Sequence, residues 1–118
     1  MQEFIKSTAA LSDITRLRIL NILLIRECCV CEVMQALEIS QTRASRNLSI
    51  LYDAGFLKQR KEGLWTHYEV DREKLAEKDS KYLDFLVKAV STALAEDKTA
   101  KSDIARLEKS KKLNSSCA

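Results

Sequence analysis

The 118-residue sequence contains no proline, only two glycines and a single histidine. Because proline and glycine interrupt helices, their scarcity favours a chain built mainly from helices joined by short turns. Aliphatic runs are also short: the longest, Ile22 to Ile25, is far below the roughly 20 residues that cross a membrane. The N-terminal stretch MQEFIKS lacks the order of a signal peptide. We therefore expect a cytoplasmic protein with no membrane partner.

Catalytic groups are missing as well. The sequence has one histidine, no paired acids in a motif and no glycine-rich phosphate loop, so no catalytic constellation can be assembled. We expect that the protein is not an enzyme. His67 itself is predicted to be a surface residue of a strand.

The positive charge is concentrated in one part of the chain. The formal net charge is +3, and a chain of this length forms one domain with a core of its own. Residues 40–63 alone carry this excess, because they hold five basic residues against two acidic ones: Arg43, Arg46, Lys58, Arg60 and Lys61 against Asp53 and Glu62. Such a local surplus favours contact with a polyanion.

The segment from Gln41 to Asp53 predicts an amphipathic helix. Ser40 is a good N-cap, Gly55 can take the left-handed conformation that ends a helix, and the apolar positions share one face. The opposite face carries side chains suited to base edges and phosphates: Gln41, Thr42, Arg43, Ser45, Arg46 and Ser49. A solvated helix face without a ligand is the alternative interpretation.

Three helices are predicted before it, and the first is a short one with a partly apolar face that includes Phe4, Ile5 and Leu11. Asp13 caps a strongly apolar helix, Ile14 to Arg26, which we expect to be the central core helix. A short helix around Val33 to Leu37 follows, and only residues 38–40 separate it from the amphipathic helix. Two helices joined by so short a turn form a helix-turn-helix. Glu38 stands where this turn usually has a glycine.

After Gly55 the pattern changes from helical to alternating. Two short runs with aromatic and β-branched residues flank a turn that contains Gly63, which predicts a β-hairpin. A hairpin directly after a helix-turn-helix is a wing. We expect its basic residues Lys58, Arg60 and Lys61 to touch the phosphate backbone.

A long helix is predicted from Ser80. Its apolar residues recur at steps of three and four and form one stripe, expected to pack on a second copy of the chain, with packing on its own core as the alternative: Tyr82, Phe85, Leu86, Ala89, Val90, Ala93 and Leu94. The predicted domain therefore spans residues 1–97. Residues 98–118 are expected to form a weakly structured tail, either a weak helix or a frayed end.

Three of the four cysteines lie within Cys28 to Cys31, and the fourth is Cys117. In the cytoplasm such a cluster favours metal or redox chemistry over disulfides. In an intact helix, side chains at positions i and i+2 point about 200° apart. We therefore expect an ion shared by Cys29 and Cys31 to unwind the first helix of the helix-turn-helix locally.

Over about Ala9 to Leu94 the sequence resembles the ArsR/SmtB family of winged-helix metalloregulatory repressors, of the arsenical-resistance type. Five stretches carry the likeness through their joint order and spacing: LSDITRLRIL, ECCVCEV, SQTRASRNLSIL, DAGFLKQRKEG and WTHYEV. The resemblance implies a mainly α-helical, dimeric winged helix-turn-helix with a small β-hairpin. It also implies a homodimer joined through its first and last helices, which adds Phe4 and Ile5 to the expected interface, bound to double-stranded operator DNA.

The resemblance further implies release from DNA by arsenic(III) or antimony(III). The stretch from Cys29 to Cys31 looks like the family's arsenic motif, in which a third cysteine usually follows three residues later, where this chain has Met34. The candidate ligands are therefore Cys28, Cys29 and Cys31, with Cys117 as another source of the third thiolate. Soft thiolates suit such ions. The long helix lacks the ligands of the family's zinc sensors.

Two other functions stay open at this point. The cysteines could make a repressor that responds to thiol oxidation instead of to an ion. The fold could also serve as a dimeric protein-interaction module that binds no DNA.

Overall fold

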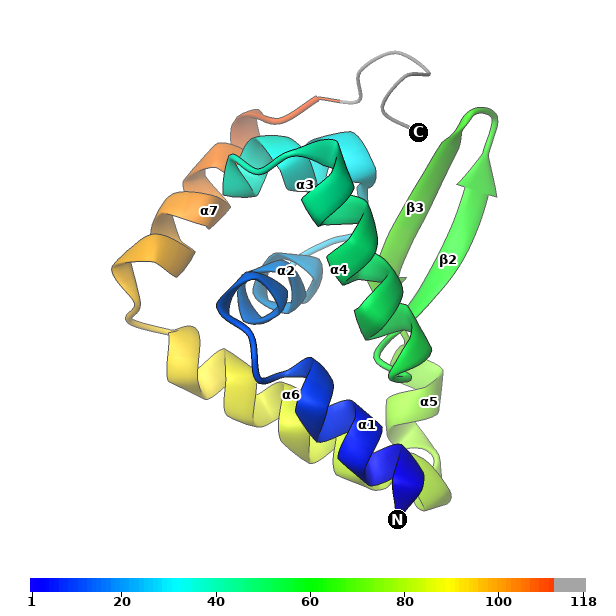
Figure 1. Ribbon diagram of the computed structural model, residues 1–118. Coiled ribbons are helices and arrows are strands. Elements are labelled where there is room, and N and C mark those ends of the chain that lie inside the picture. The colour runs from blue at the N-terminus through cyan, green and yellow to red at the C-terminus, as the bar shows by residue number, and fades with distance from the viewer. Residues whose placement is uncertain (112–118) are drawn as a thin grey trace.

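The computed structural model describes residues 1–111. Helices dominate these residues, with one small sheet between them (Figure 1). In chain order the elements are α1 (Gln2–Ala10), α2 (Ile14–Leu23), β1 (Cys28–Cys29), α3 (Val30–Leu37), α4 (Gln41–Asp53), β2 (Leu57–Glu62), β3 (Trp65–Val70), α5 (Arg72–Ala76), the 3-10 turn η1 (Lys78–Ser80), α6 (Lys81–Leu94) and α7 (Lys98–Lys109). The expected fold class is confirmed: α3 and α4 form a helix-turn-helix, and β2 and β3 form the wing beside it.

Helix α4 begins and ends where the sequence predicts. The Ser40 hydroxyl accepts a hydrogen bond from the Arg43 backbone N–H at 3.2 Å, and Gly55 has a φ of 96° just after the helix. Glu38 closes α3 with a φ of 57°, the left-handed conformation that glycine usually supplies in this turn. The substitution of glycine by Glu38 therefore leaves the turn geometry intact.

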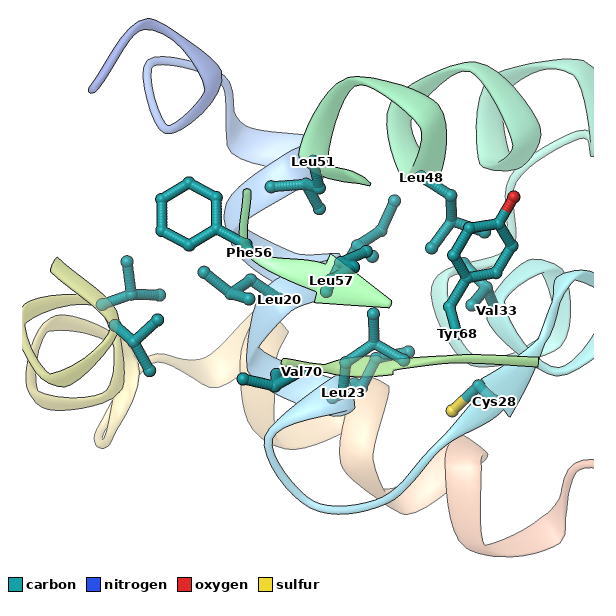
Figure 2. Close-up of a cluster of buried hydrophobic side chains, with 14 of the residues drawn as sticks. Leu20, Leu23, Cys28, Val33, Leu48, Leu51, Phe56, Leu57, Tyr68 and Val70 are labelled. Atoms are coloured by element: carbon teal, nitrogen blue, oxygen red, sulfur yellow. The ribbon is translucent and has the colours of Figure 1, made fainter. Parts of the chain in front are cut away.

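Helix α2 is the central core helix, as predicted, but it is shorter than expected. It ends at Leu23 because the chain must turn there to reach β1, and Ile25 N–H bonds to Ile22 in a tightened last turn. Its buried residues pack in the core between the sheet and α4, where Leu20 and Leu23 lie near Leu51, Phe56 and Val70 (Figure 2).

The sheet has a third strand that the sequence analysis did not predict. The strand order is β1-β3-β2, all antiparallel, and the register pairs Cys28 with Tyr68 and Cys29 with His67. Alternate residues of a strand point to opposite faces. One face of the sheet therefore carries Cys28 and Tyr68 into the hydrophobic core (Figure 2), and the other face, which we call the outer face, carries Cys29 and His67.

The expectation of a weakly structured tail from residue 98 is wrong for residues 98–109, which form α7. Asp97 caps this helix, and α7 lies against α2 and α3 (Figure 1). Inside the contact, the fully buried Asp103 carboxylate binds Arg18 at 2.9 and 2.7 Å and Arg106 at 2.9 Å. The long-range Arg18–Asp103 ion pair, together with buried Ala100 and Leu107, orders a helix whose sequence has few apolar residues.

Helix α6 presents two apolar faces. Leu83, Val87 and Val90 are buried in the core, so Val90, expected at a dimer interface, packs inward instead. Phe85, Ala89 and Ala93 are exposed on the opposite side, while Tyr82, Leu86 and Leu94 are half-buried. Sequence periodicity did not separate the two faces, because apolar residues occupy both.

Helix α1 lies beside α6 (Figure 1). The rings of Phe4 and Tyr82 meet edge to face with centroids 5.3 Å apart, and the Ser7 hydroxyl donates to the Ala54 carbonyl at 2.9 Å. Phe4 and Ile5 remain 43% and 57% exposed, respectively. Phe85, Ala89 and Ala93 of α6 are exposed too, and we call these five exposed apolar residues together the α1/α6 surface. None of the helices in residues 1–111 is long and apolar enough to span a bilayer.

Candidate nucleic-acid interface and thiol site

The outward face of α4 is open, as the sequence predicts. Gln41, Thr42, Arg46 and Ser49 are exposed and Ser45 is half-buried, and these five residues line one shallow hollow on the surface. Their amide, hydroxyl and guanidinium groups can bind base edges or phosphates. The inward face packs Ala44, Leu48 and Leu51 into the core (Figure 2 labels Leu48 and Leu51).

Arg43, also predicted on this face, has a partner within the chain. Its guanidinium donates to the Thr15 hydroxyl of α2 at 2.7 Å. The neighbouring Asn47, which sequence reasoning missed, is buried; it accepts from Arg16 at 3.0 Å and donates to the Arg43 carbonyl at 2.9 Å. This polar network fixes α4 on α2. The signal was Arg16 on the mainly apolar α2, since a charge on a core helix needs a partner.

The basic residues of the wing differ in how far their charge is neutralised. Lys58 pairs with Glu69 at 3.2 Å and Glu73 at 3.6 Å, and each of these contacts is exposed. Arg60 binds Glu27, and that bond raises the pKa of the arginine and lowers the pKa of Glu27. Within residues 1–111 Lys61, near the wing tip, takes part in no ion pair.

Cys29 and Cys31 lie together at the junction of β1 and α3. Their sulfur atoms are 3.0 Å apart, both side chains are fully buried, and the half-buried Trp65 of the wing packs against them. Two sulfurs on one ion lie at most about 4.6 Å apart, given metal–thiolate bonds of about 2.3 Å, as for zinc. At 3.0 Å the two sulfurs are within this limit, so they are close enough to share one thiophilic ion.

The premise of the expected unwinding, that Cys29 and Cys31 both lie within one helix, is wrong. Cys29 is the N-cap of α3, with extended φ and ψ of −83° and 169°, and only Cys31 is helical. The 200° separation applies within a helix, whereas the extended N-cap turns its side chain back over the first turn. Glu32 holds this geometry, since its carboxylate accepts from the Cys29 backbone N–H at 2.9 Å and binds Arg26 at 3.0 Å.

Cys28 does not join the pair. It points to the opposite face of the sheet and lies in the main core with Val33 and Tyr68 (Figure 2). Its burial raises its pKa to about 12. The prediction of Cys28 as a third ligand is therefore not supported by its position. Adjacent residues of a strand point to opposite faces of the sheet, so the sheet lies between the Cys28 thiol and the Cys29 thiol.

The environment of the pair keeps Cys29 protonated. Burial, and next the hydrogen bond with Cys31, raise the pKa of Cys29 to about 12. A thiolate is the reactive form toward oxidants, so this cysteine is a poor nucleophile at neutral pH. Among residues 1–111 no group of three His, Cys, Asp or Glu side chains is placed to hold a metal ion. Cys117, the other predicted source of a third thiolate, lies outside the described residues.

His67 is not the surface residue that the sequence predicted. It is 2% exposed on the outer face of the sheet, opposite Cys29 in the register, and its Nε2 lies 2.9 Å from the Glu62 carboxylate. The unpredicted strand β1 covers this part of β3, which is why a strand pattern alone placed His67 at the surface.

The chain resembles known regulators in sequence. Residues 13–59 match the family model for bacterial regulatory proteins of the arsR family, a stretch that includes the thiol pair and all of α4. The arsenical resistance operon repressor of Escherichia coli strain K12 is 44% identical over 61 residues, which are 51% of this chain and 52% of that protein. The repressor of the same name from Bacillus subtilis strain 168 is 30% identical over 76 residues, 64% of this chain and 72% of that protein.

The chain belongs to the ArsR family. A solved structure agrees: a homodimeric winged helix-turn-helix DNA-binding domain from Mycobacterium bovis, a possible ArsR-family transcriptional regulator, superposes with a TM-score of 0.63 at 27% identity and covers 82% of each chain. This ArsR-family chain spans about half the length of the first curated relatives it matches. The sequence comparisons and the solved structure thus agree on the ArsR family and on the winged helix-turn-helix fold.

Proposed function

We propose that this ArsR-family chain is a homodimeric, DNA-binding transcriptional repressor that leaves its operator when arsenic(III) or antimony(III) binds Cys29 and Cys31. The observation that carries the proposal is the buried pair of sulfurs 3.0 Å apart, at the junction of the helix-turn-helix with the wing strand β3. Soft thiolates prefer thiophilic ions of this kind.

The α4 face supports the DNA-binding part. In a helix-turn-helix the second helix enters the major groove with its N-terminal residues against base edges. Gln41, Thr42 and Arg46 are exposed in that position. Lys61, near the wing tip, would contact the adjacent phosphate backbone, whereas Lys58 and Arg60 must first exchange their glutamate partners for phosphate.

The α1/α6 surface supports the dimer. An exposed cluster that contains Phe4, Ile5 and Phe85 is costly in water, and a second copy of the same surface would cover it. Two copies related by a two-fold axis would place their α4 helices on successive major grooves of an operator, about 34 Å apart.

The position of the sulfurs supports coupling between ion and DNA. Cys29 belongs to the strand that pairs with β3 of the wing, and Cys31 belongs to the first helix of the helix-turn-helix. An ion bound to both sulfurs would therefore link the wing, through β1, to the first turn of α3. A protein conformation favoured by the ion and disfavoured by DNA gives each ligand a reciprocal effect on the other.

A repressor that responds to oxidation has one observation in its favour, because two sulfurs 3.0 Å apart can also form a disulfide. Full burial of both sulfurs opposes it, since redox sensors use exposed thiolates. The raised pKa of Cys29 does not separate the two functions, because the thiolate is also the form that binds an ion. Binding of an ion is therefore the function that the site favours.

Fluorescence anisotropy tests the proposal. A duplex is first selected from a random pool by the wild-type protein, and binding is measured against salt, then against arsenite, antimonite and hydrogen peroxide. We expect a steep salt dependence and release by the first two reagents. Release by peroxide alone would favour the redox function, and absence of any DNA binding would favour the protein-interaction module. Cys29→Ser should bind DNA but resist arsenite.

A further inference from the structure

His67 has a ring nitrogen that nothing in residues 1–111 uses. Its side chain is 98% buried, its Nε2 lies 2.9 Å from the Glu62 carboxylate, and its Nδ1 is buried without a hydrogen-bond partner in the described part of the chain. Buried polar atoms are nearly always hydrogen-bonded, so such an atom calls for an explanation.

The contact with Glu62 determines what Nδ1 can do. A carboxylate only accepts, so Nε2 is the ring nitrogen that donates, and in that tautomer Nδ1 keeps a lone pair. Metal-site histidines are commonly oriented in this way, by a carboxylate on one ring nitrogen. Nδ1 is therefore a pre-oriented hydrogen-bond acceptor inside the protein.

This acceptor lies on the same side of the sheet as the thiol pair. The register places His67 directly opposite Cys29, and paired residues project from the same face with Cβ atoms about 5 Å apart. Trp65, two residues earlier on the same strand face, packs against both sulfurs. The chain thus gathers two soft donors and one unused acceptor on the outer face.

We propose that His67 Nδ1 accepts a hydrogen bond from the hydroxide that remains on arsenic(III) once Cys29 and Cys31 are bound; this inference rests on the proposed function. Arsenous acid carries three hydroxides. Two As–S bonds form as two As–O bonds break, and the two thiol protons leave with the two hydroxides as water, with no change of oxidation state. The third hydroxide stays on arsenic and donates to His67.

This arrangement accounts for a site with only two thiols. Residues 1–111 provide no third metal ligand beside Cys29 and Cys31. An arsenic(III) ion that keeps one hydroxide needs no third protein ligand. On burial that hydroxide loses its hydrogen bonds to water, and an acceptor in the protein replaces one of them. His67 is then a specificity-determining residue that favours hydroxide-bearing ligands over others of the same valence.

Two arsenicals distinguish this role from simple support of the fold. Arsenite keeps one hydroxide after binding two thiolates, whereas methylarsonous acid carries a methyl group at that position and has nothing to donate. Both can be titrated into the full chain while the fluorescence of Trp65, the single tryptophan, is followed beside the sulfurs. The readout needs no DNA.

We expect His67→Phe to raise the Kd for arsenite about tenfold, the effect of one lost hydrogen bond to a buried group, and to leave the Kd for methylarsonous acid within about twofold. The His67→Asn variant has an amide oxygen that can accept a hydrogen bond, so it should retain most of the affinity for arsenite. It provides a second test if the phenylalanine variant does not fold. Thr66→Ala, on the other face of the same strand, is the control and should bind both arsenicals as wild type does.

The outcomes separate the two proposals. Equal weakening of both arsenicals by His67→Phe, or no weakening of either, overturns the role of Nδ1. In either case the thiol sensor stands if Cys29→Ser abolishes the fluorescence response to both arsenicals. If Cys29→Ser binds arsenite like wild type, the proposed function itself fails.

Discussion

Arg18 and Asp103 form a two-pronged ion pair between α2 and α7, with Nε to Oδ2 at 2.9 Å and Nη2 to Oδ1 at 2.7 Å. The carboxylate is fully buried, and the same guanidinium also donates to the Leu37 carbonyl at the end of α3, at 3.2 Å. Arg106 of α7 donates to the Ala36 carbonyl at 2.8 Å. The last turn of α3, next to the turn of the helix-turn-helix, is thus held by two arginines that share one aspartate.

Removal of that aspartate should cost much of the stability. Asp103→Ala leaves Arg18 and Arg106 without their buried partner, and breaking such a pair typically costs about 3 to 5 kcal/mol. Urea unfolding of the variant and wild type measures the difference. Glu96→Ala removes an exposed pair with Lys101 and should change stability by less than about 1 kcal/mol. Equal effects of the two variants would contradict the importance of the α7 contact.

Arg46 and Lys61 should affect DNA binding in different ways. Arg46→Ala removes a group from the centre of the exposed α4 face, so it should weaken operator binding by about 1 to 3 kcal/mol and relax sequence preference. Lys61→Ala should weaken binding to all sequences alike and lower the salt slope by about one unit. Anisotropy on the selected duplex and on a scrambled duplex measures both. Wild-type behaviour of both variants would show that this face does not bind DNA.

The α1/α6 surface should hold the dimer. Replacement of both Phe85 and Ala89 by Glu puts two charges on each copy of the surface and should give monomers with much weaker operator binding. Light scattering at micromolar concentration reports the mass. Ser91→Glu, exposed on the same helix but away from Phe85, is the matched control and should stay dimeric. A monomeric wild-type protein would rule out this interface.

The cysteine variants should divide according to whether the thiol belongs to the Cys29/Cys31 pair or lies elsewhere. Cys29→Ser and Cys31→Ser should keep operator binding and lose release by arsenite, since each removes one of two neighbouring sulfurs. Cys28→Ala should still respond to arsenite, because that thiol lies in the core, although truncation of a buried side chain lowers stability. Cys117→Ser is also expected to respond. A loss of response in Cys28→Ala, with folding intact, would place Cys28 among the ligands.

Local signals in the sequence predicted helix α4 well. The bounds of α4 follow from Ser40 and the glycine after it, and both signals act within a few residues of the helix ends. The wing was equally visible, since alternation and Gly63 lie within one hairpin. Those features need no information about distant parts of the chain.

The features that sequence reasoning missed depend on distant contacts. Strand β1 has two residues, and only its pairing with β3 reveals that Cys28 and Cys29 face opposite sides. Burial of His67 follows from the same pairing. Helix α7 is ordered by Asp103, whose partner Arg18 is 85 residues earlier in the chain. No short-range pattern contains such a pair. The burial of Cys28 in the core and the existence of α7 could therefore be seen only in the structure.

Because Cys29 is the N-cap of α3, helix capping sets the distance between the two sulfurs. One sulfur comes from an extended residue and the other from the first turn of α3, so the sulfur separation depends on the backbone angles of the cap. Glu32 fixes those angles through the Cys29 N–H, and Arg26 fixes Glu32. In the proposed ion site the sulfur separation is therefore set from Glu32 and Arg26, two residues outside the sulfur pair, and substitution at these positions would change the separation while both cysteines stay in place.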